Sequence, residues 1–297
     1  MIFVAVLAIG MTAPDVVITS PSGRQMPLLS RHERFAALLF GVDSKKDSAV
    51  LEQLSVLPVA DPPWEIHLFG SGPNDKMSSI NQAAMAKFEL PAARSMVLVN
   101  PAGKVIAVWS DLNLERLSQR VAGDGLPAGS DLGDLLSAVK GEERTDVGFL
   151  MLFLSSRGVV DGLYRDRILD AVRAAREAKI GVVAIFSNAG ESDEAVHSFF
   201  GVQESPLKAL LDAGAAFADA AGVLTTPTAV LLDAKGRLAY TGAIDSNSRA
   251  RSDNWQYLLD SLAAVKIGKS PRISRTLAFG TPIKRFRSDS GGLRAEN

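Results

Sequence analysis

Short apolar runs alternate with stretches of helical periodicity in both halves of the chain. In the first half they predict strands over residues 16–19, 35–40, 64–69, 96–99 and 105–109, and helices over 47–57, 79–88 and 112–121. In the second half they predict strands over 149–154, 182–186, 229–232 and 238–241, and helices over 164–178, 192–200, 206–213 and 254–266. The strand runs lack strict polar alternation, which is typical of strands covered on both faces. The pattern therefore predicts an α/β fold with mixed sheets flanked by helices.

The two halves carry the same motif near their ends. Residues 96–105 (Met-Val-Leu-Val-Asn-Pro-Ala-Gly-Lys-Val) match residues 229–238 (Ala-Val-Leu-Leu-Asp-Ala-Lys-Gly-Arg-Leu). Each is an apolar strand, a tight turn closed by Gly103 or Gly236, and a second strand, and glycine supplies the positive φ that such a turn needs. Because strand–helix–strand–helix precedes each hairpin, we expect two tandem copies of one fold.

A Gly/Pro/Ser-rich stretch at 123–130 and a charged stretch at 140–146 separate the halves. We expect a first domain over 1–122, a linker over 123–146 and a second domain over 147–267. From residue 266 to the end the chain has eight Lys and Arg against two Asp and Glu, a local net charge of +6. Residues 268–297 therefore read as a basic arm, extended or partly disordered, which docks on a partner or on its own domain.

The composition excludes several classes of function, mainly because the chain has no cysteine and almost no net charge. The chain of 297 residues has a formal net charge of −1, so no overall field draws it to nucleic acid, and it contains no cysteine. Disulfides, thiolate metal sites and cysteine nucleophiles are thereby excluded. The histidines His32, His67 and His197 show no metal-ligand spacing, and no phosphate-binding or nucleophile-elbow sequence occurs, so we expect neither a metal nor a cofactor.

No apolar run approaches the roughly 20 residues that span a bilayer. Residues 1–9 are apolar but lack the positive flank and cleavage site of a secretory signal, which favours a buried segment or strand over a signal remnant. We expect a soluble protein, and leave cytoplasm and periplasm open.

The second half resembles the redoxin branch of the thioredoxin-like superfamily, relatives of the AhpC/TSA type. Residues 225–245 (Thr-Thr-Pro-Thr-Ala-Val-Leu-Leu-Asp-Ala-Lys-Gly-Arg-Leu-Ala-Tyr-Thr-Gly-Ala-Ile-Asp) carry the likeness, and residues 278–285 look like the close of those proteins. The resemblance implies that Pro227 is a cis-proline before the third sheet strand. The first half resembles the same family more weakly, with Arg94 in place of this proline.

The resemblance also implies a Cys-x-x-Cys pair where the first core strand meets its helix. Gly158 and Asp161 stand at those places in the second half, and Ser44 and Asp47 in the first. Thr281 stands where many relatives carry a further cysteine. Disulfide exchange and peroxide reduction both need a thiolate, so we expect no thiol oxidoreductase or peroxidase activity from either half.

Some of these residues have two interpretations. Thr226 and Pro227 either shape a groove for an extended polypeptide or only set the turn before a strand. Ser155, Ser156 and Arg157 either bind an anion at the helix N-terminus or form a plain polar loop.

Asp161 and Asp47 suit the capping of their helices. The sequence thus favours a redox-inactive module that binds a protein, serves as a scaffold or belongs to a larger complex. A polypeptide-binding chaperone acting through the Pro227 groove and an enzyme of non-thiol chemistry are the alternatives. The identity of the partner and the oligomeric state do not follow from the sequence.

Overall fold

The computed structural model divides into two compact units: Met1–Gly125 with Arg287–Arg294, and Leu126–Phe286 with Ala295–Asn297. It describes residues 9–14, 16–19, 22–28, 35–43, 45–48, 52, 64–71, 79–80, 86–88, 90, 93–100, 102–112, 117, 126–139, 145–200, 207–247, 249, 254–289 and 292–295.

Five strands form the main sheet of the second unit, in the order β10-β9-β8-β12-β13. The central β8 is parallel to β9 and antiparallel to β12, while β9 is parallel to β10 and β12 antiparallel to β13. Every residue of β8, β9 and β12 is buried except the last residue of β12, as expected for strands covered on both faces. The strands are β8 (Gly148–Leu154), β9 (Gly181–Phe186), β10 (Lys208–Leu211), β12 (Thr228–Asp233) and β13 (Leu238–Gly242).

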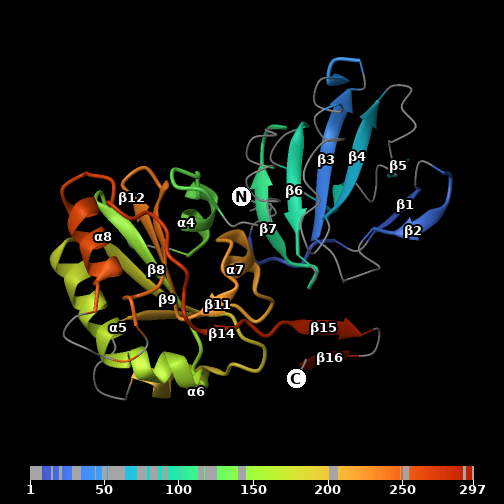
Figure 1. Cartoon of the computed structure of the whole chain (residues 1–297). Helices are drawn as coiled ribbons and strands as arrows, with labels where there is room; N and C mark the ends of the chain where they lie inside the picture. Colours follow the sequence, from blue (N-terminus) through green and yellow to red (C-terminus); the bar gives the residue numbers. More distant parts are fainter. Residues whose placement is uncertain are drawn as a thin grey trace, which may run out of the picture. The chain divides into compact units, whose positions relative to one another are not determined.

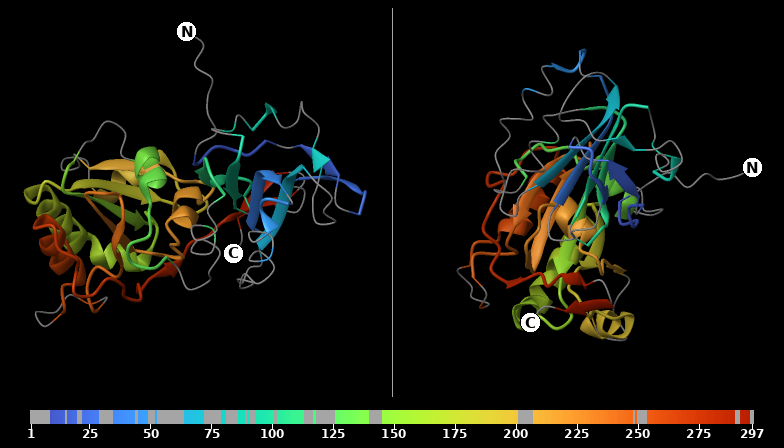
Figure 2. Two further views of the ribbon diagram at one scale, coloured as in Figure 1. Left: turned by 90° about the horizontal axis from the view of Figure 1, so that it is seen from above. Right: turned by 90° about the vertical axis from the view of Figure 1, so that its right-hand side faces the viewer.

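Helices cover both faces of this sheet, so the α/β class is confirmed. Helices α5 and α8 lie on one face, and α4 and α7 lie on the other (Figure 1), and Figure 2 shows the same elements from two further directions. The helices are α4 (Gly133–Val139), α5 (Val159–Glu177), α6 (Asp193–Phe200), α7 (Ala216–Ala220) and α8 (Tyr257–Lys266).

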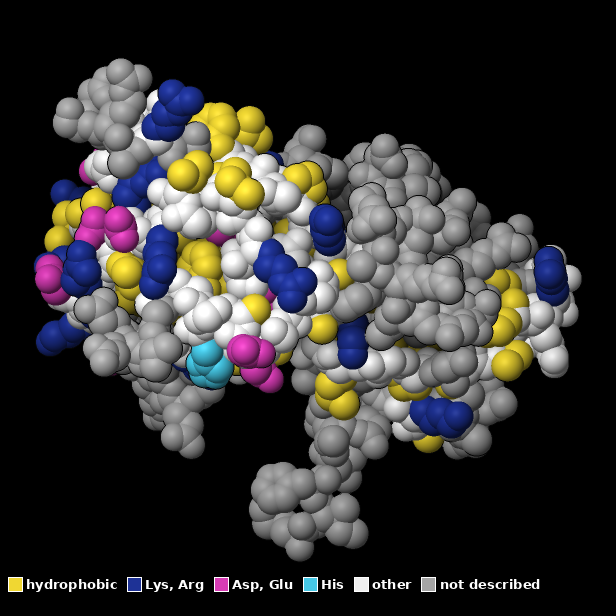
Figure 3. All heavy atoms as spheres, turned by 90° about the horizontal axis from the view of Figure 1, so that it is seen from below, with side chains coloured by type: hydrophobic (Ala, Val, Ile, Leu, Met, Phe, Trp, Pro, Cys, Tyr) yellow, Lys and Arg dark blue, Asp and Glu magenta, His cyan; other side chains and the backbone are white. Residues whose placement is uncertain are grey.

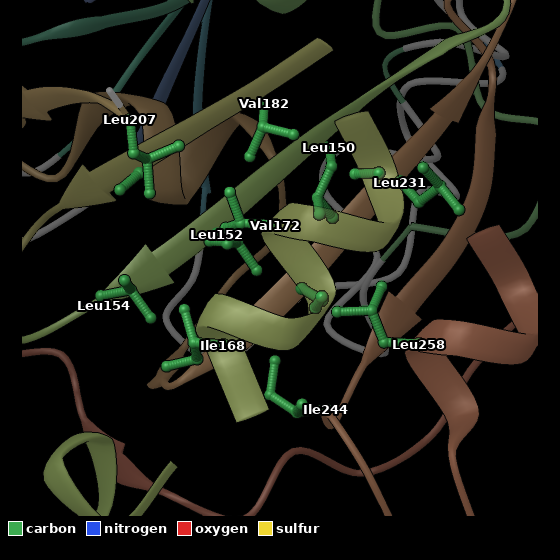
Figure 4. Close-up of a cluster of buried hydrophobic side chains, with 14 of the residues drawn as sticks. Leu150, Leu152, Leu154, Ile168, Val172, Val182, Leu207, Leu231, Ile244 and Leu258 are labelled. Carbon is green, nitrogen blue, oxygen red and sulfur yellow. The ribbon is translucent and has the colours of Figure 1, made fainter. Parts of the chain in front are cut away.

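Helix α5 is held to the sheet by an apolar stripe. Ile168 and Val172, one turn apart, lie against side chains of β8 that include Leu150 and Leu152 (Figure 4), and all four are buried. Burial of one such side chain stabilises the fold by about 1.5–3 kcal/mol. This packing fixes the N-terminal end of α5 next to the end of β8.

The main sheet of the first unit repeats part of this arrangement. Its order is β4-β3-β6-β7, with β3 parallel to β4 and antiparallel to β6, and β6 antiparallel to β7. The order and directions are those of β9-β8-β12-β13. A smaller antiparallel sheet has the order β2-β1-β5. The strands are β1 (Val17–Thr19), β2 (Gln25–Pro27), β3 (Phe35–Asp43), β4 (Trp64–Ser71), β5 (Ser79–Ile80), β6 (Ser95–Val99) and β7 (Val105–Trp109).

The predicted hairpins are confirmed, and their turns are built alike. The Oδ1 atom of Asn100 accepts the backbone N–H groups two and four residues on, at 3.1 and 2.9 Å, and the Oδ1 atom of Asp233 does the same at 2.8 and 3.0 Å. Gly103 and Gly236 have φ values of 71° and 73°. Both hairpins also shift register one residue before the turn, which indicates a β-bulge at the same place.

Two of the predicted helices are corrected by the structure. Residues 208–211 of the predicted helix 206–213 form β10, an edge strand parallel to β9. A short apolar run fits a strand or a helix equally well, and pairing with β9 decides between them. Residues 79–80, at the start of the predicted helix 79–88, form β5. The predicted helices 47–57 and 112–121 and the stretch 1–8 lie largely outside the described residues.

Part of the expected linker packs on the second unit. Gly129 donates its N–H to the Leu238 carbonyl, at 2.8 Å, and the Ser130 carbonyl accepts the Leu238 N–H, at 2.8 Å. α4 follows directly and buries Leu135 and Val139. Residues 126–139 therefore pack as part of the second unit.

The arm also docks on its own unit. Thr276 bonds to the backbone of Thr241, and β14 (Thr281–Pro282) pairs with β11 (Thr225–Thr226). A further two-stranded sheet joins β15 (Phe286–Asp289) and β16 (Gly292–Ala295).

Candidate functional site

The loop after β8 meets the loop before β12 at the start of α5. Gly158 is the N-cap residue of α5 and makes no side-chain cap hydrogen bond, and Asp161 lies in the first turn. The Thr226–Pro227 peptide bond is cis, as the resemblance implies. The Thr226 hydroxyl donates a hydrogen bond to the Asp161 carboxyl, at 3.2 Å, so the two loops are joined directly.

Asp161 is fully buried and holds the site together. Its Oδ1 atom accepts the Ser155 N–H at 2.8 Å, and its Oδ2 atom accepts the Thr226 hydroxyl. Burial raises the pKa of Asp161 to about 7, against the lowering effect of these two hydrogen bonds, and the negative charge of Glu191 raises it further. Asp161 lies in the first turn of α5, and its carboxyl also reaches back to the end of β8.

Gly158 and Asp161 fit each other sterically. A Cβ atom at position 158 would lie 2.1 Å from the Asp161 Oδ2 atom and 3.2 Å from the Ser155 Cβ atom. Gly158 has φ −69°, which any residue adopts, so contact rather than backbone conformation requires glycine here. The two positions where the resemblance implies cysteines are thus occupied by a matched pair.

A carboxylate from the chain itself fills the predicted anion position. The Glu191 Oε1 atom accepts the Ser155 hydroxyl at 2.9 Å and the Ser156 N–H at 3.1 Å, and its Oε2 atom accepts the Ser156 hydroxyl. Arg157 is exposed beside them. The sequence analysis did not identify Glu191, because it lies 35 residues from Ser156 in a loop with no motif.

The edge beside the cis-proline is occupied as well. β14 pairs with β11 so that Thr281 lies opposite Thr226. A Cβ atom at Gly280 would lie 2.0 Å from the Thr226 carbonyl oxygen, so this close approach requires glycine. Thr281, which stands where relatives carry a cysteine, therefore lies beside the loop that holds Asp161.

The first unit has a similar junction. The Asp47 carboxylate accepts the Asp43 N–H from the end of β3, at 2.8 Å, and is paired by both terminal nitrogens of Arg94, at 2.7 and 3.0 Å. The hydrogen bonds from Arg94 hold the pKa of Asp47 below its usual value. Arg94, identified from the sequence only as the residue replacing the proline, is thus the partner of Asp47. Ser44 lies outside the described residues.

The described residues hold neither a metal-binding group of side chains nor a helix that could span a membrane. Its residues include no group of three or more His, Cys, Asp or Glu that could hold a metal ion. No helix formed by the same residues is long and apolar enough to cross a membrane.

No family model matches this chain, and no curated protein matches it. Among solved structures it is similar to a hypothetical protein from Sinorhizobium meliloti 1021 (26% identity, TM-score 0.43, 48% of this chain and 82% of that one). It is also similar to an uncharacterized conserved protein from Geobacillus kaustophilus, with 19% identity, a TM-score of 0.42 and coverage of 50% of this chain and 82% of that one. A third similar structure is a secreted Mycobacterium tuberculosis disulfide oxidoreductase, with 16% identity, a TM-score of 0.31 and coverage of 41% of this chain and 82% of that one. By its own strand order and its cis-proline before the antiparallel β12, the second unit is thioredoxin-like.

The raised pKa of Asp161 predicts a pH dependence of stability. The unfolded chain loses this proton near pH 3.8, whereas the native chain keeps it until about pH 7. The stabilisation is therefore complete below the lower value and is lost as the pH rises through the higher one, by at most about 1.4 kcal/mol per pH unit. We expect Asp161→Asn to flatten the fall in unfolding free energy between pH 6 and 7, measured by denaturant unfolding.

Asp166→Asn, an exposed change on the same helix, is the control and should leave the slope unchanged. The window starts at pH 6 because the pKa of Asp212 is itself raised to about 6, by burial. Equal slopes for wild type and Asp161→Asn would show that Asp161 does not keep its proton in the folded state.

Proposed function

We propose that this chain is a redox-inactive thioredoxin-fold protein that acts by binding a protein partner, as a scaffold or a subunit of a complex. One observation carries the proposal: the positions implied for the cysteine pair hold Gly158 and the buried, hydrogen-bonded Asp161, whose carboxyl leaves no room for a Cβ atom at position 158. The fold is kept while the reactive position is closed. Such a molecule offers its surface rather than a reactive group.

An exposed apolar surface borders this closed position. Val159 and Leu163 lie one turn apart on α5, and Leu277 and Phe279 lie on the segment before β14, with exposed fractions from 48% to 80%. Figure 3 shows one face of the molecule, on which hydrophobic side chains of the second unit are exposed among Lys and Arg. We call Val159, Leu163, Leu277 and Phe279 the apolar rim. Exposed apolar groups of this kind mark protein interaction sites.

The segment that carries Leu277 and Phe279 is anchored to the second unit at both ends. At one end of the segment, the Thr276 hydroxyl bonds to the hydroxyl of Tyr240, at 2.8 Å, and accepts the Ala243 N–H, at 2.9 Å. At the other end, Gly280 packs on Thr226, the partner of Asp161. The end of the segment next to Phe279 therefore lies near the first turn of α5, which carries Asp161.

Two alternatives find less support. A chaperone that binds polypeptide along the cis-proline edge needs the backbone of β11, which β14 already pairs. The Ile283 N–H also donates a hydrogen bond to the Leu224 carbonyl, at 2.9 Å, which holds the residues after β14 next to β11. An enzyme using Asp161 as a base near neutral pH needs access to its carboxyl, which is fully buried.

The test is purification of the tagged protein from its source, with mass spectrometry of what accompanies it. We expect a stoichiometric partner with the wild type and with Ile267→Asp, whose side chain is exposed at the end of α8. The double variant Leu277→Asp, Phe279→Asp should lose that partner at least tenfold. A monomer without partner in every case would contradict the proposal, and suppression of client aggregation by that monomer would favour the chaperone alternative.

We infer further that both halves derive from one redoxin-like unit of the AhpC/TSA branch. The shared strand order, the matching hairpin turns and the two Asp-centred junctions support this origin. The domain boundary within 123–146 and the location in cytoplasm or periplasm stay predictions.

A further inference from the structure

The second unit contains a cavity away from the closed thiol position. It has a volume of about 460 Å³ and lies between the turn that joins β12 to β13, the end of α8 and the residues that follow it. Its lining includes none of Ser155, Asp161, Thr226 or Pro227. A volume of this size suits a small molecule.

The cavity combines an apolar wall with a cationic mouth. Val147, Leu238 and Val265 supply apolar surface, and the last two are buried. The charged lining residues are Lys235, Arg237, Lys269 and Asp233. Three cations thus face one carboxylate.

The charges at the mouth are not neutralised by the described part of the chain. Its salt bridges do not include Lys235, Arg237 or Lys269, and all three are exposed. The Oδ1 atom of Asp233 is already engaged by the backbone N–H groups of Lys235 and Arg237. The cations therefore keep their side-chain donors for a ligand.

Two carbonyl groups at the end of α8 already accept backbone hydrogen bonds. Helix C-termini carry unsatisfied carbonyl groups and a partial negative charge. In this chain the Ala264 carbonyl accepts the N–H groups of Ile267 and Lys269, at 3.2 and 3.0 Å, and the Val265 carbonyl accepts that of Gly268, at 2.9 Å. These backbone hydrogen bonds reduce the negative potential that the Ala264 and Val265 carbonyls present to a ligand.

We propose that this cavity binds a small anion with an apolar body, such as a carboxylate, sulfonate or phosphate joined to a ring or chain. The guanidinium of Arg237 pairs with two oxygens of the anionic group, and the ammonium groups of Lys235 and Lys269 add positive charge. The body lies against Leu238 and Val265. This site is independent of the proposed protein binding.

The probe is 8-anilinonaphthalene-1-sulfonate, which joins a sulfonate to an apolar ring system, titrated by fluorescence into the full chain. We expect the double variant Lys235→Glu, Lys269→Glu to weaken binding at least tenfold. The double variant Lys266→Glu, Arg272→Glu makes the same change of net charge outside the cavity lining and should change binding less than twofold. Uncharged N-phenyl-1-naphthylamine, which lacks the sulfonate, should bind at least tenfold more weakly to the wild type.

Two results would overturn this site. Equal weakening by both double variants would mean that net charge alone attracts the dye. Loss of binding in Leu277→Asp, Phe279→Asp but not in Lys235→Glu, Lys269→Glu would mean that the dye binds the apolar rim. Ala128→Trp, which places a large side chain in the lining, gives an independent check and should reduce binding without changing charge.

Discussion

Replacing Arg167 by methionine will lower the free energy of unfolding of the second unit by about 3–5 kcal/mol. Arg167 projects from α5 to Asp245, whose side chain is completely buried after β13. One guanidinium nitrogen lies 2.6 Å from the Asp245 carboxylate and 2.7 Å from the Asn247 carbonyl oxygen. Methionine would leave Asp245 buried without its opposite charge. Denaturant unfolding followed by fluorescence of Trp255, the tryptophan of this unit, measures the change.

The matched control is Arg173→Met on the same helix. Arg173 pairs with Asp170 where both side chains are more than half exposed, so we expect a loss below about 0.5 kcal/mol. Adding Asp245→Asn to Arg167→Met should restore part of the stability, since it removes the unpaired charge. Equal losses for Arg167→Met and Arg173→Met would refute a buried, structurally important ion pair.

Gly158→Ala should destabilise the second unit by about 1–3 kcal/mol, although alanine can adopt the backbone conformation of this residue. The new methyl group would meet the Asp161 Oδ2 atom at 2.1 Å. That oxygen cannot simply turn away, because the carboxyl is buried and held by Ser155 and Thr226. Equilibrium unfolding of the four proteins of a Gly158→Ala, Asp161→Ala cycle measures the coupling.

In the Asp161→Ala background we expect Gly158→Ala to cost less than about 0.5 kcal/mol, because the obstructing oxygen is gone. Gly162→Ala provides the contrast within α5. A Cβ atom there meets nothing within 4 Å, so alanine should stabilise the helix by about 0.5–1 kcal/mol. If the two Gly158→Ala costs are the same with and without Asp161, the steric match between these residues is wrong.

Structural elements that depend only on residues close together in the chain could be predicted from the sequence. Both hairpins depend on an Asn or Asp that accepts N–H groups two and four residues on and on a glycine at positive φ, all within five residues. The strands of both main sheets other than β10 were predicted for a similar reason, since buried strands give continuous apolar runs. The helix predicted over 206–213 was wrong because its apolar run fits either structure, and only the neighbouring β9 makes 208–211 a strand.

At the candidate site, the start of α5 was also not predictable from local sequence. The sequence analysis began this helix at residue 164, whereas it begins at Val159. Gly158, Asp161 and Gly162 are poor helix formers, so local propensity argued against these first turns. Packing of Ile168 and Val172 on the sheet, together with the bonds of Asp161, outweighs that preference.

The sequence by itself determined the α/β class, the duplicated hairpin, the likeness to thioredoxin-type proteins and the absence of thiol chemistry, which follows from the lack of cysteine. The tertiary structure decided which side-chain pairs occupy the positions where the resemblance implies cysteines. Asp161 meets Thr226 across 65 positions, Ser156 meets Glu191 across 35, and Asp47 meets Arg94 across 47. Periodicity and turn motifs report only on neighbours along the chain. Such distant pairs form because the sheets bring the ends of their strands together, and burial there fixes which polar groups must bond.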